Sequence, residues 1–359
     1  MTACGRCEAV PAIPDGGRLS LAAPLGHTRK RLHAFLRARG LAVDDSVDDV
    51  MTVDLPGGLL HSLAVELVGG FSRSELNDTR CLLLPPDVSP ALSDLGRTLS
   101  LSSLVARSQG GWLIEMMQER RLTAFFQPIV LTANPAEVHG HECLLRGCER
   151  DGSIVSAGEI LRVARDADML FTLDRAARLE AIRNVVEKRP SGQIFINFAP
   201  TAIYDPAFCL RTTVSAVEES GLPAERFVFE VNEADRIADL DHLAGIVRFY
   251  RQRGFRIALD DLGAGYGSLD LLARLQPDYV KIDLGLVRGV DQDPFRARVL
   301  DRLLDLARDL RLLTLVEGIE TEAEWNWARD HGADFSQGFL FARPAALPPP
   351  VHLPGSPAR

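Results

Sequence analysis

The stretch that decides the fold is residues 255–269, FRIALDDLGAGYGSL. Its apolar run, IAL, is typical of a buried strand, and the run ends in two adjacent carboxylates, Asp260 and Asp261, before a glycine-rich turn. Two such charges about 4 Å apart, at an effective dielectric constant of about 20, repel each other by about 4 kcal/mol. A fold tolerates that repulsion at a solvated turn, or where a cation or a catalytic role compensates it. The plain interpretation is a strand followed by a polar turn, and the alternative is a site with a cation or a catalytic role. The rest of the chain decides between these two interpretations.

The chain has 359 residues, enough for two domains or for one large barrel with an appendage. Hydrophobic residues make up 46% of it, which is typical of a globular protein and not of a disordered one. A formal net charge of −9 argues against a broad basic surface, so we expect no direct nucleic-acid binding and no membrane association. A small anionic ligand remains compatible with that charge if metal ions reverse the local field.

The N-terminal end carries no targeting signal that we recognise. No apolar run reaches the length of a membrane span, and the first residues, MTACGRCEAV, lack the apolar core of a signal peptide. We therefore predict a cytoplasmic protein whose cysteines are mostly reduced. Cys4 and Cys7 form a C-x-x-C pair, but no second paired motif completes a metal site. Half of a zinc site, a redox pair and a flexible tail all remain open for this segment.

The region before residue 122 has no recognisable chemistry, and a sensor or dimerisation module is the default interpretation. We predict a flexible tail over 1–25, a small α/β domain over 26–98, and a connecting helix over 99–121 that bends near Gly110 and Gly111. Within the small domain the pattern favours helices over 27–39 and 59–68 and strands over 50–55 and 81–84.

From residue 122 short apolar runs alternate with longer amphipathic segments, which is typical of parallel α/β sheets and barrels. Eight such units in about 230 residues fit a TIM-type (β/α)8 barrel. We place this domain at 122–345 and a flexible C-terminal tail at 346–359. The predicted strands are 125–130, 138–145, 194–198, 227–231, 256–260, 279–283, 312–316 and 339–341.

Polar side chains occur within or just after most of these runs. In TIM-type barrels the carboxyl ends of the strands form the active site, so we expect these side chains to meet there. Each one alone has a plain explanation as a strand-end cap or an ion pair, but so many uncompensated anions would destabilise a fold. Hard oxygen ligands suit Mg²⁺ or Mn²⁺, and Asp260 is placed to bridge two ions about 3.5–4 Å apart. The set comprises Glu142, Asn197, Glu230, Asp260, Asp261, Lys281, Asp283, Glu317 and Gln337.

Strand alternation predicts which side chains point into the barrel, because residues two apart share a face. Glu142, Leu144 and Arg146 are expected to point inward together. Cys143 alternates with them, so we expect it to face the surrounding helices and to leave the metal site untouched.

Several of these residues lie in short motifs that occur in one order between about residues 122 and 344. They are FQPI at 126–129, ECLLR at 142–146, EVNE at 230–233, DDLGAGYGSL at 260–269, KID at 281–283, EGIET at 317–321 and QG at 337–338. Together they resemble the EAL domain, the cyclic-di-GMP phosphodiesterase family, with Cys143 where the family usually has Ala and Asn232 where it has Thr. No GGDEF cyclase signature is present, and the resemblance does not extend to the N-terminal region.

The resemblance implies a role for each matched position. One Mg²⁺ or Mn²⁺ ion would be held by Glu142, Asn197, Glu230 and Asp260, and a second by Asp260, Asp261 and, through water, Asp283. Ca²⁺, which is larger, would inhibit. Catalytic roles would fall to Lys281 and Glu317, which position or deprotonate the attacking water, to Glu233, which anchors the glycine loop, and to Glu320, which supports the site. The substrate-binding residues would be Gln127, Leu144, Arg146 and Gln337.

The function implied by the resemblance is hydrolysis of cyclic di-GMP to linear 5′-pGpG by a two-metal mechanism, in a homodimer. The alternatives differ in class. A catalytically inactive EAL receptor would bind cyclic di-GMP and signal to a protein partner, and an interaction module would bind no nucleotide. His139 and His141 resemble the H-x-H motif of amidohydrolases. Both alternate with Glu142, so we expect them to face outward, and the later strands offer acids where such enzymes need further histidines.

Overall fold

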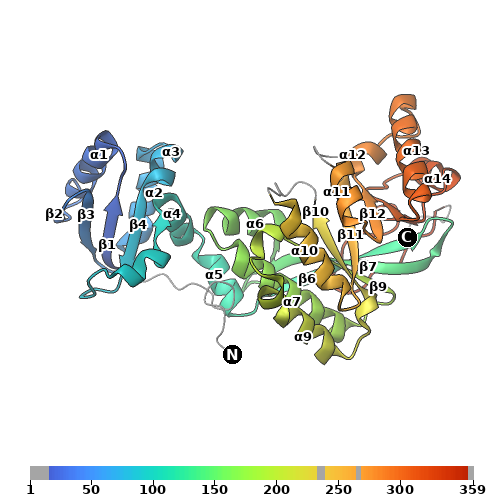
Figure 1. Cartoon of the computed structure of the whole chain (residues 1–359), viewed down its shortest axis with the longest axis horizontal. Coiled ribbons are helices and arrows are strands. Elements are labelled where there is room, and N and C mark those ends of the chain that lie inside the picture. The colour runs from blue at the N-terminus through green and yellow to red at the C-terminus, as the bar shows by residue number, and fades with distance from the viewer. Residues whose placement is uncertain (1–15, 233–238, 264–267, 355–359) are drawn as a thin grey trace. The chain divides into compact units, whose positions relative to one another are not determined.

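The computed structural model describes residues 16–232, 239–263 and 268–354, and the chain divides into two compact units (Figure 1). Among the described residues, one unit comprises 16–121 with 158–173, and the other comprises 122–157 and the described residues from 174 to 354. None of the described helices is long and apolar enough to cross a membrane. Each unit has an apolar core of its own.

The N-terminal unit is built on a five-stranded antiparallel sheet with the order β2-β3-β1-β4-β5. Alternate strand residues such as Leu19, Leu21 and Val53 pack against apolar helix residues such as Leu32 and Leu63. The strands are β1 Gly17–Ala22, β2 Val43–Val47, β3 Val50–Leu55, β4 Arg80–Leu84 and β5 Leu99–Ser100. The helices are α1 Gly26–Arg37, α2 Leu59–Gly70, α3 Arg73–Asp78, α4 Leu101–Gln109, α5 Gly111–Gln118 and α6 Ala157–Asp166.

Most elements predicted for this region are present, since α1, β3, α2 and β4 lie where two helices and two strands were expected. The predicted N-terminal tail is too long, because β1 lies in the middle of the sheet. The predicted connecting helix is interrupted at Gly110, as expected. Its first half, α4, buries Leu101, Leu104 and Val105 in the core of this unit, so it is more than a connector.

The second unit is a closed barrel with helices around it, which confirms the predicted TIM-type fold. The ring has the order β6-β14-β13-β12-β11-β10-β9-β7, and pairing between β6 and β7 closes it. Neighbouring strands are parallel except β6, which is antiparallel to β7 and β14. The strands are β6 Leu122–Leu131, β7 Asn134–Cys148, β9 Gln193–Phe198, β10 Phe227–Asn232, β11 Arg256–Leu262, β12 Tyr279–Ile282, β13 Leu313–Val316 and β14 Phe335–Ser336, with β8 Ile154–Ser156 beside β7.

Helices of several lengths connect these strands. They are α7 Leu170–Lys188, α8 Pro206–Cys209, α9 Arg211–Ser220, α10 Leu240–Arg251, α11 Ser268–Leu275, α12 Leu284–Val287, α13 Pro294–Asp309 and α14 Glu322–Asp330, with short 3-10 helices η2 Pro200–Ala202 and η3 Ala224–Arg226.

The C-terminal part of the barrel differs from the expectation. The last strand is β14, so the prediction of a strand at 339–341 is wrong. That apolar run forms a turn, in which Phe341 N donates to Gly338 O, and Phe341 packs outside the barrel with residues of α13. His352 N donates to Phe341 O at 2.7 Å and Val351 packs against the same cluster. The described part of the predicted C-terminal tail is therefore packed against the barrel.

Two apolar layers line the barrel wall. The outer layer lies between strands and helices and contains Cys143, as predicted. The inner layer consists of Ile129, Phe195, Val228, Ala258, Tyr279, Leu315 and Phe335.

The two histidines of β7 face opposite sides of this wall. His139 stacks on the inner-layer ring of Phe335 with the ring centroids 3.8 Å apart, so the prediction that it faces outward is wrong. A register shift between β6 and β7, next to Ile129, breaks the alternation. His141 contacts the edge of the Phe126 ring, which belongs to the outer layer, as expected.

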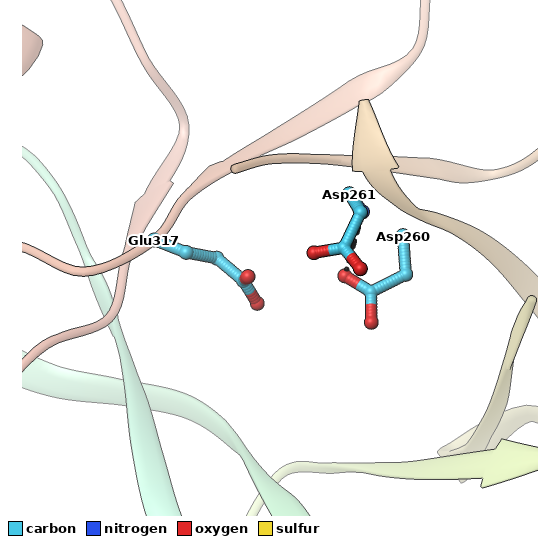
Figure 2. Close-up of side chains that lie close together, drawn as sticks. All are labelled: Asp260, Asp261 and Glu317. Atoms are coloured by element: carbon cyan, nitrogen blue, oxygen red, sulfur yellow. Dashed lines mark hydrogen bonds between the residues drawn. The ribbon is translucent and has the colours of Figure 1, made fainter. Parts of the chain in front are cut away.

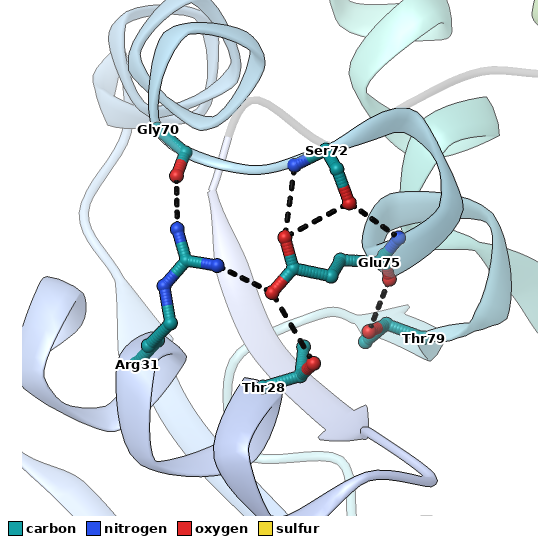
Figure 3. A network of polar contacts seen from close by, with 6 residues as sticks. All are labelled: Thr28, Arg31, Gly70, Ser72, Glu75 and Thr79. Carbon is teal, nitrogen blue, oxygen red and sulfur yellow. Dashed lines mark hydrogen bonds and ion pairs between the residues drawn. The ribbon is translucent and has the colours of Figure 1, made fainter.

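The N-terminus of α3 is held by a hydrogen-bonded network around Glu75 (Figure 3). Ser72 Oγ accepts from Glu75 N, and Glu75 Oε2 accepts from Ser72 N at 2.9 Å, which makes a capping box. Glu75 Oε1 accepts from Arg31 Nη1 at 2.5 Å and from Thr28 Oγ1 at 3.3 Å, which links α3 to α1. The hydrogen bond from Ser72 N is the main cause that lowers the pKa of Glu75 to about 2.

We predict that Glu75→Gln lowers the free energy of unfolding of the N-terminal unit at pH 7, because an amide cannot accept all of these bonds. Since the folded-state pKa is depressed, the carboxylate contributes stability above its unfolded-state pKa of about 4.3 and loses it as the pH falls toward 2. Urea unfolding at pH 7 and pH 3 should therefore show a difference between the two proteins that shrinks at pH 3. Asp48→Asn, in the exposed turn between β2 and β3, is the control. An equal difference at both pH values would contradict the assignment.

Candidate active site

The inner apolar layer determines which side chains reach the mouth of the barrel. On each parallel strand, the residue two positions after the inner-layer position also points inward, and that residue is polar. On β6, which runs in the opposite direction, that position is Gln127, two residues before Ile129, and β7 places Glu142 opposite Gln127. The structure therefore brings together, from different strands, Gln127, Glu142, Asn197, Glu230, Asp260, Lys281, Glu317 and Gln337.

Lys281 lies at the centre of this group, with 1% of its side chain exposed. Its Nζ lies 2.8 Å from Glu230 Oε1 and 2.8 Å from Glu317 Oε1. It also lies 3.1 Å from Asp260 Oδ1 and 3.6 Å from Glu142 Oε1. A single cation is thus surrounded by four carboxylates that come from four different strands or strand ends.

The charges in this group shift one another's protonation. Burial alone would lower the pKa of Lys281, but the surrounding carboxylates, Asp260 first, raise it well above its usual value. Burial raises the pKa of Glu230 and of Glu317 well above the usual range of a carboxyl group, and Lys281 opposes that shift only in part. Lys281 is therefore charged, and full ionisation of the acids is disfavoured unless further positive charge is present.

Glu142 accepts a hydrogen bond at each of its oxygens. Asn197 Nδ2 donates to Oε1 at 3.1 Å, and Gln337 Nε2 donates to Oε2 at 2.8 Å. Gln337 Nε2 also lies 3.2 Å from Gln127 Oε1. Burial opposes ionisation of Glu142, but Lys281 and the two amide donors outweigh it and lower its pKa. This network holds Glu142 as an anion in a fixed orientation.

Asp260 and Asp261 are adjacent in sequence, yet both carboxylates project to the same side (Figure 2). A regular strand would send them to opposite faces. The pairing of β11 with β12 shifts register between Leu259 and Leu262, and Asp261 has a positive φ of 58°, which is uncommon for a residue other than glycine. One oxygen from each aspartate and one from Glu317 lie within 4.8 Å of one another. The bulge therefore turns two neighbouring acids into a pair of potential ligands for one site.

The donor set at the mouth fits divalent cations. Glu230 Oε2 and Gln337 Oε1 are buried and have no hydrogen-bond partner among the described residues. A buried acceptor without a partner costs free energy, which a bound cation or an ordered water would remove. The clustered groups of Asp260, Asp261 and Glu317 offer carboxylate oxygens, the ligands that Mg²⁺ and Mn²⁺ prefer.

Two expected site residues, Asp283 and Glu320, lie apart from the group around Lys281. Asp283 is partly exposed and caps α12, with Oδ1 accepting from Gly285 N at 2.8 Å. Glu320 is exposed and pairs with Arg288 at 2.7 Å. Glu233 falls outside the described residues.

Leu144 and Arg146 follow Glu142 along β7 and are partly exposed. The guanidinium of Arg146 lies 5.5 Å from the centre of the Phe125 ring, and burial lowers the pKa of this arginine. Phe125 is two residues from Gln127 on β6 and directly opposite Leu144, so it shares their face. Phe125 was not among the expected site residues, although its alternation with Gln127 is the signal that places it here.

We predict that Lys281→Met destabilises the metal-free protein more than the metal-loaded protein. Removing one partner of a buried ion pair costs about 3–5 kcal/mol, because the remaining charges stay buried and repel one another. Thermal unfolding should therefore show a large loss of Tm in EDTA and a smaller loss in Mg²⁺. Lys30→Met, exposed on α1, is the control. Equal losses in the two buffers would contradict a counter-ion role for Lys281.

Comparison with known proteins finds a family model and curated relatives. A family model described as the EAL domain matches residues 111–344. The probable cyclic di-GMP phosphodiesterase PdeG of Escherichia coli (strain K12) is 31% identical over 230 residues, which cover 62% of this chain and 44% of that protein. PdeB of the same organism, described in the same words, is 30% identical over 245 residues, which cover 66% and 45%. The chain therefore spans less than half the length of these relatives.

Solved structures give a matching result. The c-di-GMP-bound form of a standalone EAL protein from Vibrio cholerae O395 is 36% identical, with a TM-score of 0.59 over 64% of this chain and 95% of that chain. BlrP1 from Klebsiella pneumoniae, in a manganese and cyclic di-GMP complex, is 22% identical, with a TM-score of 0.56 over 91% of this chain and 95% of that chain. The second likeness concerns the fold alone, and it extends beyond the barrel.

Proposed function

The chain belongs to the EAL domain family, and on this premise we propose that it hydrolyses cyclic di-GMP to linear 5′-pGpG. The observation that carries the proposal is the set of carboxylate oxygens around Lys281 together with the close group of Asp260, Asp261 and Glu317, which offer the oxygen donors that divalent ions need. The names of PdeG and PdeB and the c-di-GMP bound to the Vibrio cholerae protein support the choice of substrate. We further expect a cytoplasmic homodimer, as the family resemblance implies.

Two overlapping sets of ligands would hold two divalent ions, Mg²⁺ or Mn²⁺, while Ca²⁺ would inhibit because it favours larger and looser coordination. Bound there, the ions would supply Lewis-acid chemistry that draws charge from the phosphate and makes water more acidic. The first set is Glu142, Asn197, Glu230 and Asp260, and the second is Asp260, Asp261 and, through water, Asp283.

The protein groups nearest the reaction would be Lys281 and Glu317. Hydrolysis needs a water molecule in line with the P–O3′ bond and a base that takes its proton. Lys281 Nζ would donate a hydrogen bond that orients the water, and Glu317, 2.8 Å from Lys281 and with 18% of its side chain exposed, would accept the proton. The water oxygen bonds to phosphorus as the P–O3′ bond breaks, and the 3′ oxygen takes up a proton and leaves as a hydroxyl.

The remaining residues would bind substrate or order the site. Gln127 and Gln337 contact each other beside Glu142, so they would fix that carboxylate as well as face the dinucleotide. Arg146 would pair with a phosphate, and Leu144 and the ring of Phe125 would provide an apolar face for a guanine base. Glu320, held by Arg288, would support the site from outside, and Glu233 would anchor the glycine loop.

We predict that the purified protein converts cyclic di-GMP to linear 5′-pGpG with Mg²⁺ or Mn²⁺ and has no activity after EDTA treatment. Asp260→Asn should lower kcat at least about 100-fold, because one ligand would serve both ions. Chromatography of the nucleotide products measures both effects, and Asp270→Asn, exposed on α11, is the control. Binding of cyclic di-GMP without product would favour the receptor alternative. Full activity in EDTA would refute the metal mechanism.

We predict that Glu317→Gln lowers kcat roughly 100- to 10,000-fold while KM changes only a few-fold, since a general base acts mainly in the transition state. Steady-state kinetics measures the two parameters separately. Glu320→Gln is the matched comparison three residues away, and it should cost less because Glu320 pairs with Arg288 at the surface. Near wild-type turnover in Glu317→Gln would show that another group takes the proton.

A further inference from the structure

A buried ion pair on α7 lies beside the strand end that carries Asn197. Asp174 and Arg178 are one helical turn apart and pair with each other, with 6% and 2% of their side chains exposed. Arg178 Nε donates to Thr213 Oγ1 on α9 at 3.1 Å. The other carboxylate oxygen of Asp174, Oδ1, accepts a hydrogen bond from the backbone N–H of Ala199 at 2.8 Å. The pair therefore joins α7, α9 and the segment that follows β9.

Stability alone does not account for such a pair. Two charges taken out of water lose hydration that their mutual attraction barely restores, and apolar replacements of similar volume are often neutral or stabilising. An apolar side chain could not accept the hydrogen bond from Ala199. That hydrogen bond therefore explains why position 174 carries a carboxylate.

Ala199 is the point at which the chain leaves the barrel. The pairing of β9 with β10 extends to Phe198, and η2 begins at Pro200, which has no N–H. The N–H of Ala199 is thus the donor between the end of the strand pairing and the start of the helix. Asp174 fixes that N–H, and with it the direction of the chain two residues after Asn197.

The orientation of Asn197 matters because its amide has two different tasks. Its Nδ2 donates to Glu142 Oε1 at 3.1 Å. This bond uses the nitrogen end of the amide, so Oδ1 is the atom that can bind a ligand. We propose that Asp174 is a positioning residue that, by holding Ala199, keeps the Asn197 amide oxygen in the direction needed to bind a cation. The inference rests on the proposed function, since it concerns the cation that Asn197 would hold.

The test compares Asp174→Asn with Asp174→Ala in the full-length protein. Both variants remove the ion pair, but only asparagine keeps an oxygen that can accept the Ala199 hydrogen bond. Mn²⁺ binding, followed by the electron paramagnetic resonance of free Mn²⁺ below the unfolding temperature of both variants, should weaken about 10- to 100-fold in Asp174→Ala. In Asp174→Asn it should weaken less than about threefold. Equal losses in the two variants would mean that the ion pair is only structural, and would overturn the inference.

The substitution Asn197→Ala supplies a second measurement. If Asp174 acts through Asn197, then Asp174→Ala should weaken Mn²⁺ binding by less than about twofold in the Asn197→Ala background. The same loss in both backgrounds would overturn the inference, as would wild-type Mn²⁺ affinity in Asp174→Ala. A wild-type protein that binds no Mn²⁺ would instead count against the proposed function.

A neutral background keeps the test usable if the single variants do not fold because Arg178 is left unpaired. There, Asp174→Asn with Arg178→Met is compared with Asp174→Leu with Arg178→Met, which differ in the acceptor oxygen and not in charge. The same difference in Mn²⁺ affinity is expected, and no difference would overturn the inference. Arg302→Met with Asp305→Leu, an exposed pair on α13, is the control and should leave Mn²⁺ affinity unchanged.

Discussion

The ammonium group of Lys281 lies within 3.6 Å of an oxygen from each of four carboxylates, and the arrangement of side chains at the barrel mouth depends on that contact. At an effective dielectric constant of about 20, each attraction is worth about 5 kcal/mol, whereas two carboxylates at an assumed separation of about 5 Å would repel each other by about 3 kcal/mol. The attractions and the more numerous repulsions nearly cancel before any cost of burial. The cluster is therefore short of positive charge, and the closed barrel, which fixes every strand end, holds it in one place.

The composition of this cluster could be predicted from the sequence because two regularities coincide. Strand residues alternate between faces, and a parallel barrel collects the same end of every strand at one mouth. A polar residue two positions beyond a buried one, such as Glu230 beyond Val228, therefore had to lie at the mouth. The same reasoning explains why Glu320, which is in a loop after β13, lies apart and pairs with Arg288.

Two kinds of feature could not be predicted from the sequence. In one, a strand residue departs from the regular alternation between faces, and in the other, a strand is too short or too polar to show an apolar pattern. The direction of Asp261 depends on a bulge with a positive φ, and that of His139 depends on a register shift between β6 and β7. Both are properties of strand pairing and not of local sequence. The strand β14 has two residues, one of them Ser336, so the longer apolar run after it was the stronger signal. β1 mixes Arg18 and Ser20 with apolar residues at the end of a Gly- and Pro-rich segment, and composition alone suggested a tail.

The reversed strand β6 has a consequence for how the barrel folds. It makes β6 and β7 a hairpin, in which Gln127 and Glu142 are paired partners only a short loop apart in the chain. Gln337, which completes their network, is separated from Gln127 by 210 residues. Contacts between distant segments bear the larger entropy of loop closure and are the slower to form. We therefore expect the hairpin of β6 and β7 to form early in folding and the hydrogen bonds of Gln337 to form last. The site would then be completed in the same step in which β14 pairs with β6 and closes the barrel.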